Sequence, residues 1–249
     1  MAAVPAANAG GGVPTSAMKA ASGPARIVGH AQSKGAGPMV NIRSTNWAGY
    51  VAKGQTFAFV RGSWVVPRVT CSSSDAVASF WLGMDGYQSR TVEQVGSLGY
   101  CHHGKPTYYT WWEMYPTNNM QLVGKAVHPG DHITATVSFS GHTFTLRVVD
   151  ATHRENSFSK YSTCSSCRRA TVEWVAERPG RASGLFPLAK FGHLRFSQSR
   201  VGVGTSRGSI SRWAHDAIVM INRNGATLAN VSALQSQGNQ FVATWLRSQ

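Results

Sequence analysis

Short segments of strand-forming residues, separated by turn residues, follow one another along most of this chain. They are rich in Val, Thr, Trp, Tyr and Phe, many alternate between apolar and polar positions, and no long stretch has the 3.6-residue period of a helix. Turn signals such as Asp85-Gly86, Ser140-Gly141 and Asn224-Gly225 stand between them. The pattern predicts an all-β chain that folds as an antiparallel sandwich or barrel.

The strands are expected in one domain that covers residues 44–249. Residues 1–43 are rich in Ala, Gly and Pro and contain no aromatic residue, so they cannot bury enough apolar surface to fold alone. We expect a disordered leader or pro-segment there, and one turn of helix near Ser232–Gln237. The expected strands are Trp47–Ala52, Ala58–Val66, Ala78–Met84, Arg90–Gly96, Thr107–Tyr115, His132–Ser138, Thr143–Val149, Ala170–Ala176, Gly192–Val201 and Ile218–Asn222.

The charge balance of the chain is strongly basic. Lys and Arg total 24 against 10 Asp and Glu, which gives a formal net charge of +14. This excess is either an ordinary solvated surface or an attraction toward an anionic polymer or surface. No basic run with interleaved aromatic residues and no nucleic-acid motif is present, so specific nucleic-acid binding is not expected. No run of about 18 apolar residues exists, so no transmembrane segment is expected.

Four cysteines allow three disulfide pairings. An even count in a chain rich in Ser, Thr and Gly favours disulfides and an oxidising, extracellular compartment. We expect the pairs Cys71–Cys101 and Cys164–Cys167. A zinc site from Cys101, His102 and His103 would need awkwardly adjacent ligands, so no metal and no cofactor are expected.

Half of the carboxylates in this acid-poor chain fall in strand-like segments. In Thr171–Glu177, alternation places Glu173, Val175 and Glu177 on one face of a strand and Trp174 on the other. The carboxylates then line either a concave cleft or an ordinary solvent-facing strand. The five acids concerned are Asp85, Glu93, Glu113, Glu173 and Glu177.

A second segment, Tyr108–Pro116, carries large aromatic residues on both faces. Glu113 shares its face with Tyr109, Trp111 and Tyr115. A carboxylate among aromatic rings is either a paired core group or part of a substrate groove, and burial would raise its pKa toward values useful in acid–base catalysis.

Taken together, these segments resemble the glutamic peptidase (eqolisin) family, in the form of a bacterial-type member. Any one motif would be weak, but their order and rough spacing also fit, over about residues 44–200. The matching segments are Ser44–Tyr50, Gly62–Pro67, Trp81–Gly86, Glu93–Gly96, Tyr109–Pro116, Pro129–Asp131, Val172–Glu177 and Leu185–Gly192.

The resemblance implies a sandwich of two antiparallel sheets, similar to concanavalin-like lectins. It also implies a catalytic pair on one concave sheet, which falls on Gln94 and Glu177; nothing in Gln94 itself indicates catalysis. Trp47, Trp81, Asp85 and Glu113 match positions around the cleft of the family. We add Trp111, Trp112 and Glu173 of the same segments as candidate substrate-binding residues.

The predicted function is therefore that of a secreted, monomeric endopeptidase that cleaves polypeptides at acidic pH. The pair would act on a bound water without a covalent intermediate. Two alternatives remain open. A glycoside hydrolase would use Glu173 and Glu177, although residues four apart on a strand lie ~13 Å apart and retaining cleavage needs about 5–5.5 Å. A carbohydrate-binding module would use the aromatic stripe of Tyr109, Trp111 and Tyr115.

Overall fold

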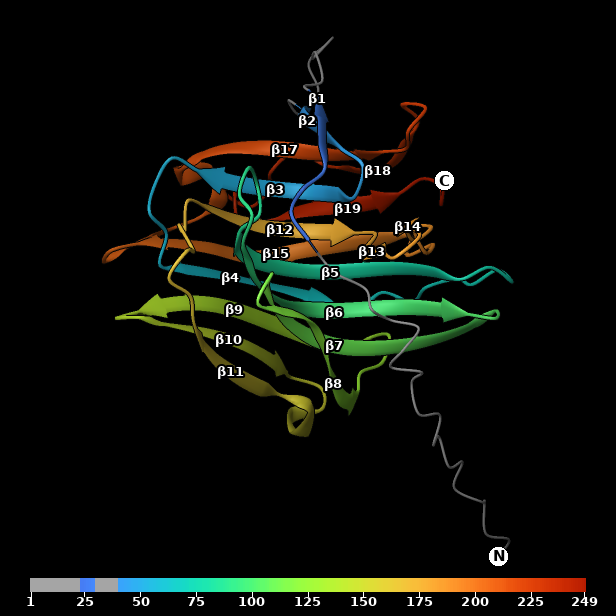
Figure 1. Cartoon of the computed structure of the whole chain (residues 1–249), viewed down its shortest axis with the longest axis horizontal. Helices are drawn as coiled ribbons and strands as arrows, with labels where there is room; N and C mark the ends of the chain where they lie inside the picture. Colours follow the sequence, from blue (N-terminus) through green and yellow to red (C-terminus); the bar gives the residue numbers. More distant parts are fainter. Residues whose placement is uncertain (1–22, 30–39) are drawn as a thin grey trace, which may run out of the picture.

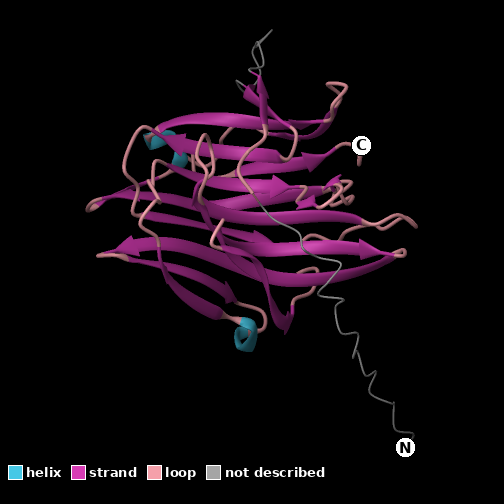
Figure 2. Cartoon of the chain, in the orientation of Figure 1, coloured by secondary structure: helices cyan, strands magenta, loops and turns pink. Residues whose placement is uncertain are grey.

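The computed structural model describes residues 23–29 and 40–249, and most of this chain is strand (Figure 2). The described residues contain no α-helix, only single 3-10 turns at Arg154–Asn156 (η1) and Ile210–Arg212 (η2). The all-β prediction is confirmed, and the helical turn expected near Ser232–Gln237 is wrong. Ser236 and Gln237 have φ angles of 50° and 58°, which a right-handed helix does not allow, and the backbone N–H of Gln235 donates to Gln240 O.

The strands form two layers, and Figure 1 looks onto the front one. All strand pairs among the described residues are antiparallel except β2–β17. The front layer runs in the order β8 (Asn118–Ala126), β7 (Lys105–Tyr115), β6 (Val92–His102), β5 (Ala76–Asp85), β12 (Thr171–Glu177), β3 (Trp47–Lys53) and β17 (Ala214–Ile221), with β2 (Val40–Ser44) and β1 (Ile27–Gly29) added beside β17. The antiparallel β-sandwich prediction is confirmed.

The back layer is continuous with the front layer along one edge. It runs in the order β11 (Phe158–Thr163), β10 (Thr143–Asp150), β9 (His132–Ser140), β4 (Phe59–Val65), β15 (His193–Val203), β19 (Phe241–Trp245) and β18 (Thr227–Val231). β18 then pairs with β17 of the front layer. The short strands are β13 (Gly180–Arg181), β14 (Gly184–Leu185) and β16 (Ser206–Gly208).

The main core lies between the layers and is built from the inward-facing residues of both. Trp174 on β12 is fully buried there, and its indole N–H donates to Arg61 O of β4 in the back layer at 2.9 Å. Gly62 permits this approach, because a Cβ on it would come within 2.8 Å of the Trp174 ring. A second apolar cluster, with Trp47, Trp81 and Trp111, lies on the opposite, outer face of the front layer. The outer face of the front layer is therefore not an ordinary solvent-facing surface, because it buries apolar side chains of its own.

Every expected strand coincides with an observed one, but several observed strands were not expected. β8 and β11 have polar or exposed sequences, and β6 extends beyond Gly96 to His102, where His103-Gly104 forms the turn. The folded part also begins before Ser44. Residues 27–29 pair with β2, and the backbone N–H of Thr45 donates to Arg26 O at 2.9 Å. The rest of the expected leader, residues 1–22 and 30–39, lies outside the described residues.

Both expected disulfides are formed. Cys71–Cys101 joins the chain after β4 to the end of β6, with a Cα–Cα distance of 5.4 Å. Cys164–Cys167 closes a short loop between β11 and β12, with a Cα–Cα distance of 5.6 Å. No described helix is long and apolar enough to cross a membrane.

Candidate active site

Strand β12 carries two carboxylates on the outer face of the front layer. Val172, Trp174 and Ala176 face the main core, whereas Val175 belongs to the outer cluster, so Glu173 and Glu177 face outward beside it. The strand pairs in unbroken register with both β3 and β5. The predicted face assignment is confirmed, and without a bulge the two carboxylates keep the spacing of a regular strand.

Gln94 lies on β6 between a glycine and a carboxylate. It pairs with Gly83 of β5 on one side and with Glu113 of β7 on the other. A Cβ on Gly83 would come 2.8 Å from the Gln94 Cβ, so only glycine fits beside this side chain. The amide Nε2 of Gln94 donates to Glu113 Oε2 at 2.6 Å, and both residues are fully buried. The hydrogen bond fixes the orientation of the amide.

Glu177 is oriented by two donors from neighbouring strands. The indole N–H of Trp81 on β5 donates to Glu177 Oε2 at 2.9 Å, and Asn46 Nδ2 donates to Glu177 Oε1 at 3.2 Å. Trp47 packs edge-on against Trp81, with ring centroids 4.9 Å apart. Gly96 lies beside Trp81 on β6, where a Cβ would come 2.6 Å from the Trp81 Cβ.

An electrostatic interaction links Glu177 to Glu113, the hydrogen-bond partner of Gln94. Burial raises the pKa of Glu113 well above its usual value, and the next largest cause is the charge of Glu177. The Gln94 hydrogen bond opposes the rise. The charge interaction thus links Glu177 to Glu113, the hydrogen-bond partner of Gln94, and an amide with carboxyl groups of this kind can hold a water and move a proton.

A second group of carboxylates includes Glu173, which pairs with Gly83 of β5 and so lies in the same row of the sheet as Gln94. Burial, and next the charge of Asp85, raise the pKa of Glu93 to about 9. Burial also raises the pKa of Glu173, with smaller contributions from the charges of Asp85 and Glu93. The carboxylate of Asp85 accepts the backbone N–H groups of residues 168, 169 and 170 at 2.7–2.8 Å. Asp85 thus holds the chain that enters β12, and Glu173 interacts with this group.

A profile of the peptidase A4 family matches residues 45–243. The chain belongs to the peptidase A4 family. Aspergillopepsin-2 of Aspergillus niger is 25% identical over 227 residues, which cover 82% of this chain and 78% of that protein. The enzyme is therefore a glutamic-type endopeptidase, a hydrolase of polypeptides.

Solved structures of glutamic peptidases share the fold of this A4 peptidase. Scytalido-glutamic peptidase with a transition state analog inhibitor superposes with a TM-score of 0.69 at 21% identity, over 81% of this chain and 98% of that one. Aspergilloglutamic peptidase from Aspergillus niger gives a TM-score of 0.59 at 23% identity, over 69% of this chain and 99% of that one.

The tryptophans predicted as site residues of this A4 peptidase divide between the two faces of the front layer. Trp47, Trp81 and Trp111 all belong to the outer cluster that surrounds Glu177 and Glu113. Trp112 packs against the main core instead, and Lys160 Nζ lies 5.8 Å from the centroid of its ring. The structure does not bring Trp112 to the candidate site, because neighbouring residues on a strand point to opposite faces.

Asn46 was not predicted to be a site residue. It lies in the turn between β2 and β3, where Ser44 Oγ donates to its Oδ1 at 2.9 Å. The one signal for Asn46 in the sequence is its place in the matching segment Ser44–Tyr50, because Asn in a turn is ordinary and Glu177 follows 131 residues later.

The segment Gly23–Gly29 lies across the outer face of the front layer (Figure 1). Ala25 and Ile27 pack against the outer cluster, and the backbone N–H of Ala25 donates to Gly86 O at 3.0 Å. Asn46 holds the segment as well as Glu177, since its Nδ2 donates to Pro24 O at 3.3 Å and its Oδ1 accepts the N–H of Arg26 at 2.7 Å. We call Gly23–Gly29 the covering segment.

A cavity of about 440 Å³ opens beside the covering segment. Tyr115 of β7 and Asn46 lie in its wall, together with the turn of residues 180–185. Gln94, Glu113 and Glu177 are nevertheless 0% exposed. In this conformation a polypeptide has no direct access to the carboxylate of Glu177.

Proposed function

We propose that Gln94 and Glu177 are the catalytic pair and hydrolyse peptide bonds through a bound water, without a covalent intermediate. The observation that supports this assignment best is the position of Glu177. Its two oxygens are held by Trp81 and Asn46, and its charge acts on Glu113, the hydrogen-bond partner of Gln94. The family supports hydrolysis, and the link from Glu177 through Glu113 to Gln94 supports this pair.

Glu177 is the group that moves protons in this proposal. It takes a proton from the attacking water and later gives it to the leaving amine. The Gln94 amide carries two N–H donors. One donates to Glu113 and fixes the amide, and we assign the other to the oxyanion that forms on the scissile carbonyl, where one donor contributes roughly 3–4 kcal/mol.

Glu113 and the tryptophans position these groups. Burial raises the pKa of Glu113 well above its usual value, which favours its neutral form and so limits the negative charge next to the oxyanion. Trp47, Trp81 and Trp111 surround the pair with apolar surface, which strengthens the electrostatic interactions inside the site. We assign these residues to substrate binding and positioning, with activity at acidic pH.

We further propose that the enzyme is secreted and that the covering segment acts as a pro-segment. The two disulfides favour an oxidising compartment. The covering segment shields Glu177 through Asn46 and the outer cluster, so the substrate requires its displacement. A polypeptide bound in the cleft would take the place of this segment.

One assay tests the activity against both alternatives. The protein is incubated with a denatured protein and with β-glucan, from acidic to neutral pH, and new amines and new reducing ends are measured. We expect new amines only, with the highest rate at acidic pH. New reducing ends would favour the glycoside hydrolase, and binding to β-glucan without either product would favour the binding module.

A further inference from the structure

The outer face of the back layer is basic. Along β4, β9, β10 and β15, apolar residues face the main core and polar residues face outward. The outward residues include many Ser and Thr but no carboxylate on these four strands. We call this surface the basic face; its basic side chains are Arg61, Arg147, Arg195, Arg200, His132 and His193.

Three of these arginines form a row across the strands. Arg200 of β15 is paired directly with Arg61 of β4, which is paired with Thr136 of β9, which in turn is paired with Arg147 of β10. With neighbouring strands about 4.8 Å apart, the row spans ~14 Å. Like charges placed directly opposite each other destabilise a sheet. The opposed pair of Arg61 and Arg200 therefore lowers the stability of the sheet, so the needs of the fold do not explain it.

The described residues place no carboxylate against this row. Among the described residues, Arg61, Arg147, Arg195 and Arg200 form no ion pair. Arg61 donates through one terminal nitrogen to Gln198 Oε1 at 3.2 Å, but its Nε is buried and has no partner within the described part of the chain. A row of arginines with an unsatisfied guanidinium N–H is suited to an external anion.

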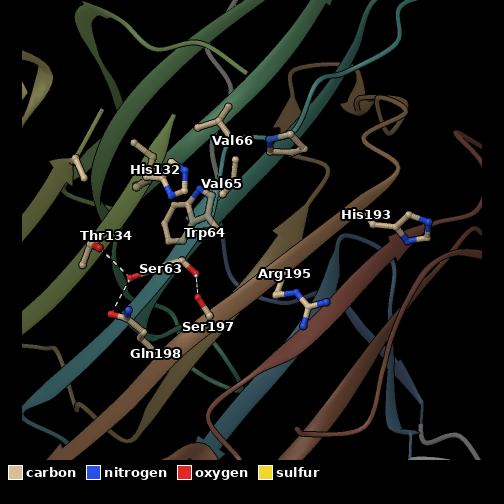
Figure 3. Close-up of a pocket in the computed structure, with 13 residues that line it drawn as sticks. Ser63, Trp64, Val65, Val66, His132, Thr134, His193, Arg195, Ser197 and Gln198 are labelled. Atoms are coloured by element: carbon tan, nitrogen blue, oxygen red, sulfur yellow. Dashed lines mark hydrogen bonds between the residues drawn. The ribbon is translucent and has the colours of Figure 1, made fainter. Parts of the chain in front are cut away.

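A depression of about 560 Å³ continues from this row along the basic face (Figure 3). It lies over β4, β9 and β15, with Ser63, Thr134 and Ser197 in its floor and Arg195 at its side. Ser63 Oγ and Thr134 Oγ1 are 2.8 Å apart, and Ser197 Oγ donates to Ser63 O at 3.2 Å. The floor is thus a set of hydroxyl groups, which can exchange hydrogen bonds with the hydroxyls of a sugar.

The lining of the depression distinguishes a polysaccharide from a nucleic acid. Single-stranded nucleic acids bind by stacking their bases on exposed aromatic rings, in addition to their phosphate contacts. Among the residues that line the depression, Trp64 alone is a Phe, Tyr or Trp, and it is only 3% exposed. The lining of the depression thus offers cations and hydroxyls, and the exposed ring of Tyr161 on β11 lies outside that lining.

We propose that the basic face binds an extended anionic polysaccharide, through carboxylate or sulfate groups on the arginine row and sugar hydroxyls over Ser63, Thr134 and Ser197. The basic face is on the back layer and Glu177 is on the outer face of the front layer. The polymer therefore holds the enzyme by the side opposite its catalytic residues, and bound enzyme remains able to cleave a polypeptide.

The test measures binding of the full chain to four probes at physiological salt: polygalacturonate, dextran sulfate, neutral dextran and an oligo-dT strand. We expect binding to one or both of the charged polysaccharides, which separates carboxylate from sulfate recognition, and none to neutral dextran. The double variant R61Q/R200Q should weaken binding at least about tenfold, since it removes two charge-assisted contacts. Arg195→Gln, outside the row, is a second variant with an expected loss in the same direction.

The matched control is K105Q/R223Q, which removes the same charge from exposed positions outside the back layer. It should leave binding nearly unchanged. The thermal stability of R61Q/R200Q should not fall, because the opposed charges are gone, and its peptidase rate on a short peptide should stay at the wild-type level. Equal losses in both double variants, tighter binding to oligo-dT than to either polysaccharide, or no binding to any probe would each overturn the proposal.

Discussion

The indole N–H of Trp81 donates to Glu177 Oε2 at 2.9 Å, across the pair of strands β5 and β12. Trp47 packs edge-on against Trp81, yet its own indole N–H has no hydrogen-bond partner among the described residues. Two adjacent and equally buried tryptophans thus differ in one hydrogen bond, which separates the role of the N–H group from the role of the ring.

Trp81→Phe keeps most of the apolar ring and removes the donor to Glu177. Loss of a hydrogen bond to a charged group is expected to lower kcat by about tenfold or more. It should also shift the acidic limb of the pH–rate profile, because the carboxylate of Glu177 loses a hydrogen-bond donor. Steady-state kinetics as a function of pH measures both effects. Trp47→Phe is the control, and an equal shift in that variant would show that the ring, not the N–H, is responsible.

The assignment of the catalytic pair predicts the effect of two conservative changes. Glu177→Gln keeps the shape and removes the proton-transfer group, and Gln94→Glu removes the amide donor and places a second carboxyl against Glu113. Each should reduce peptide hydrolysis at least ~10²-fold while the thermal midpoint stays close to that of the wild type. Glu173→Gln is the control and should cost much less, although Glu173 lies in the row of Gln94, because the charges that act on it are those of Asp85 and Glu93. Loss of activity in Glu173→Gln alone would favour the interpretation in which both carboxylates act. Full activity in Glu177→Gln would rule out the assignment.

The layers and faces of this fold could be predicted from the sequence because strand alternation is local. In Thr171–Glu177 the period of two alone places Trp174 in the core and Glu177 on the outer face. The end of β6 could not be predicted, since Gly96 and Gly99 resemble strand breakers. In the folded protein they are needed because Trp81 and Val69 pack against them.

The candidate site depends on contacts between distant residues, so most of it could not be predicted from the residues themselves. Gln94 is a neutral amide, and its position is decided by Glu113 on the next strand and by the missing side chain of Gly83. Composition also placed the start of the fold too late. Residues 23–29 lack aromatic residues, but they are held by backbone hydrogen bonds such as Thr45 N–H to Arg26 O.

The buried carboxyls predict a fold that is most stable in acid. The pKa of Glu93 rises from 4.5 to about 9 on folding. Below pH 4.5 the group is protonated in both states, and its stabilising contribution is fully present. As the pH rises toward 9, the unfolded chain releases the proton while the native state retains it, so the free energy of unfolding decreases. The raised pKa values of Glu113 and Glu173 also make the free energy of unfolding decrease as the pH rises.

Thermal midpoints measured from pH 4.5 to pH 9 check this expectation. Glu93→Gln removes one titrating group, so its midpoint should decline less with pH than that of the wild type. Glu155→Gln, at an exposed position, should decline as the wild type does. Changes in overall charge repulsion are nearly the same in both variants and cancel in the comparison. Parallel curves for Glu93→Gln and the wild type would contradict the burial effect.

The covering segment offers a last prediction, because two adjacent residues in it differ in their environment. Ile27 packs against the outer cluster, whereas the side chain of Val28 is 55% exposed. Ile27→Arg would place a charge against apolar surface and weaken the hold of the segment, so the rate of peptide hydrolysis should rise. Val28→Arg adds the same charge outside the contact and should leave the rate unchanged.

A recognition sequence for a specific protease, inserted between residues 30 and 39, provides an independent route, since cleavage after folding should also raise the rate. If neither release of the segment nor Ile27→Arg increases hydrolysis in a chain that is otherwise active, residues 23–29 are a fixed part of the fold rather than a pro-segment, and the substrate reaches Glu177 by the cavity beside Tyr115.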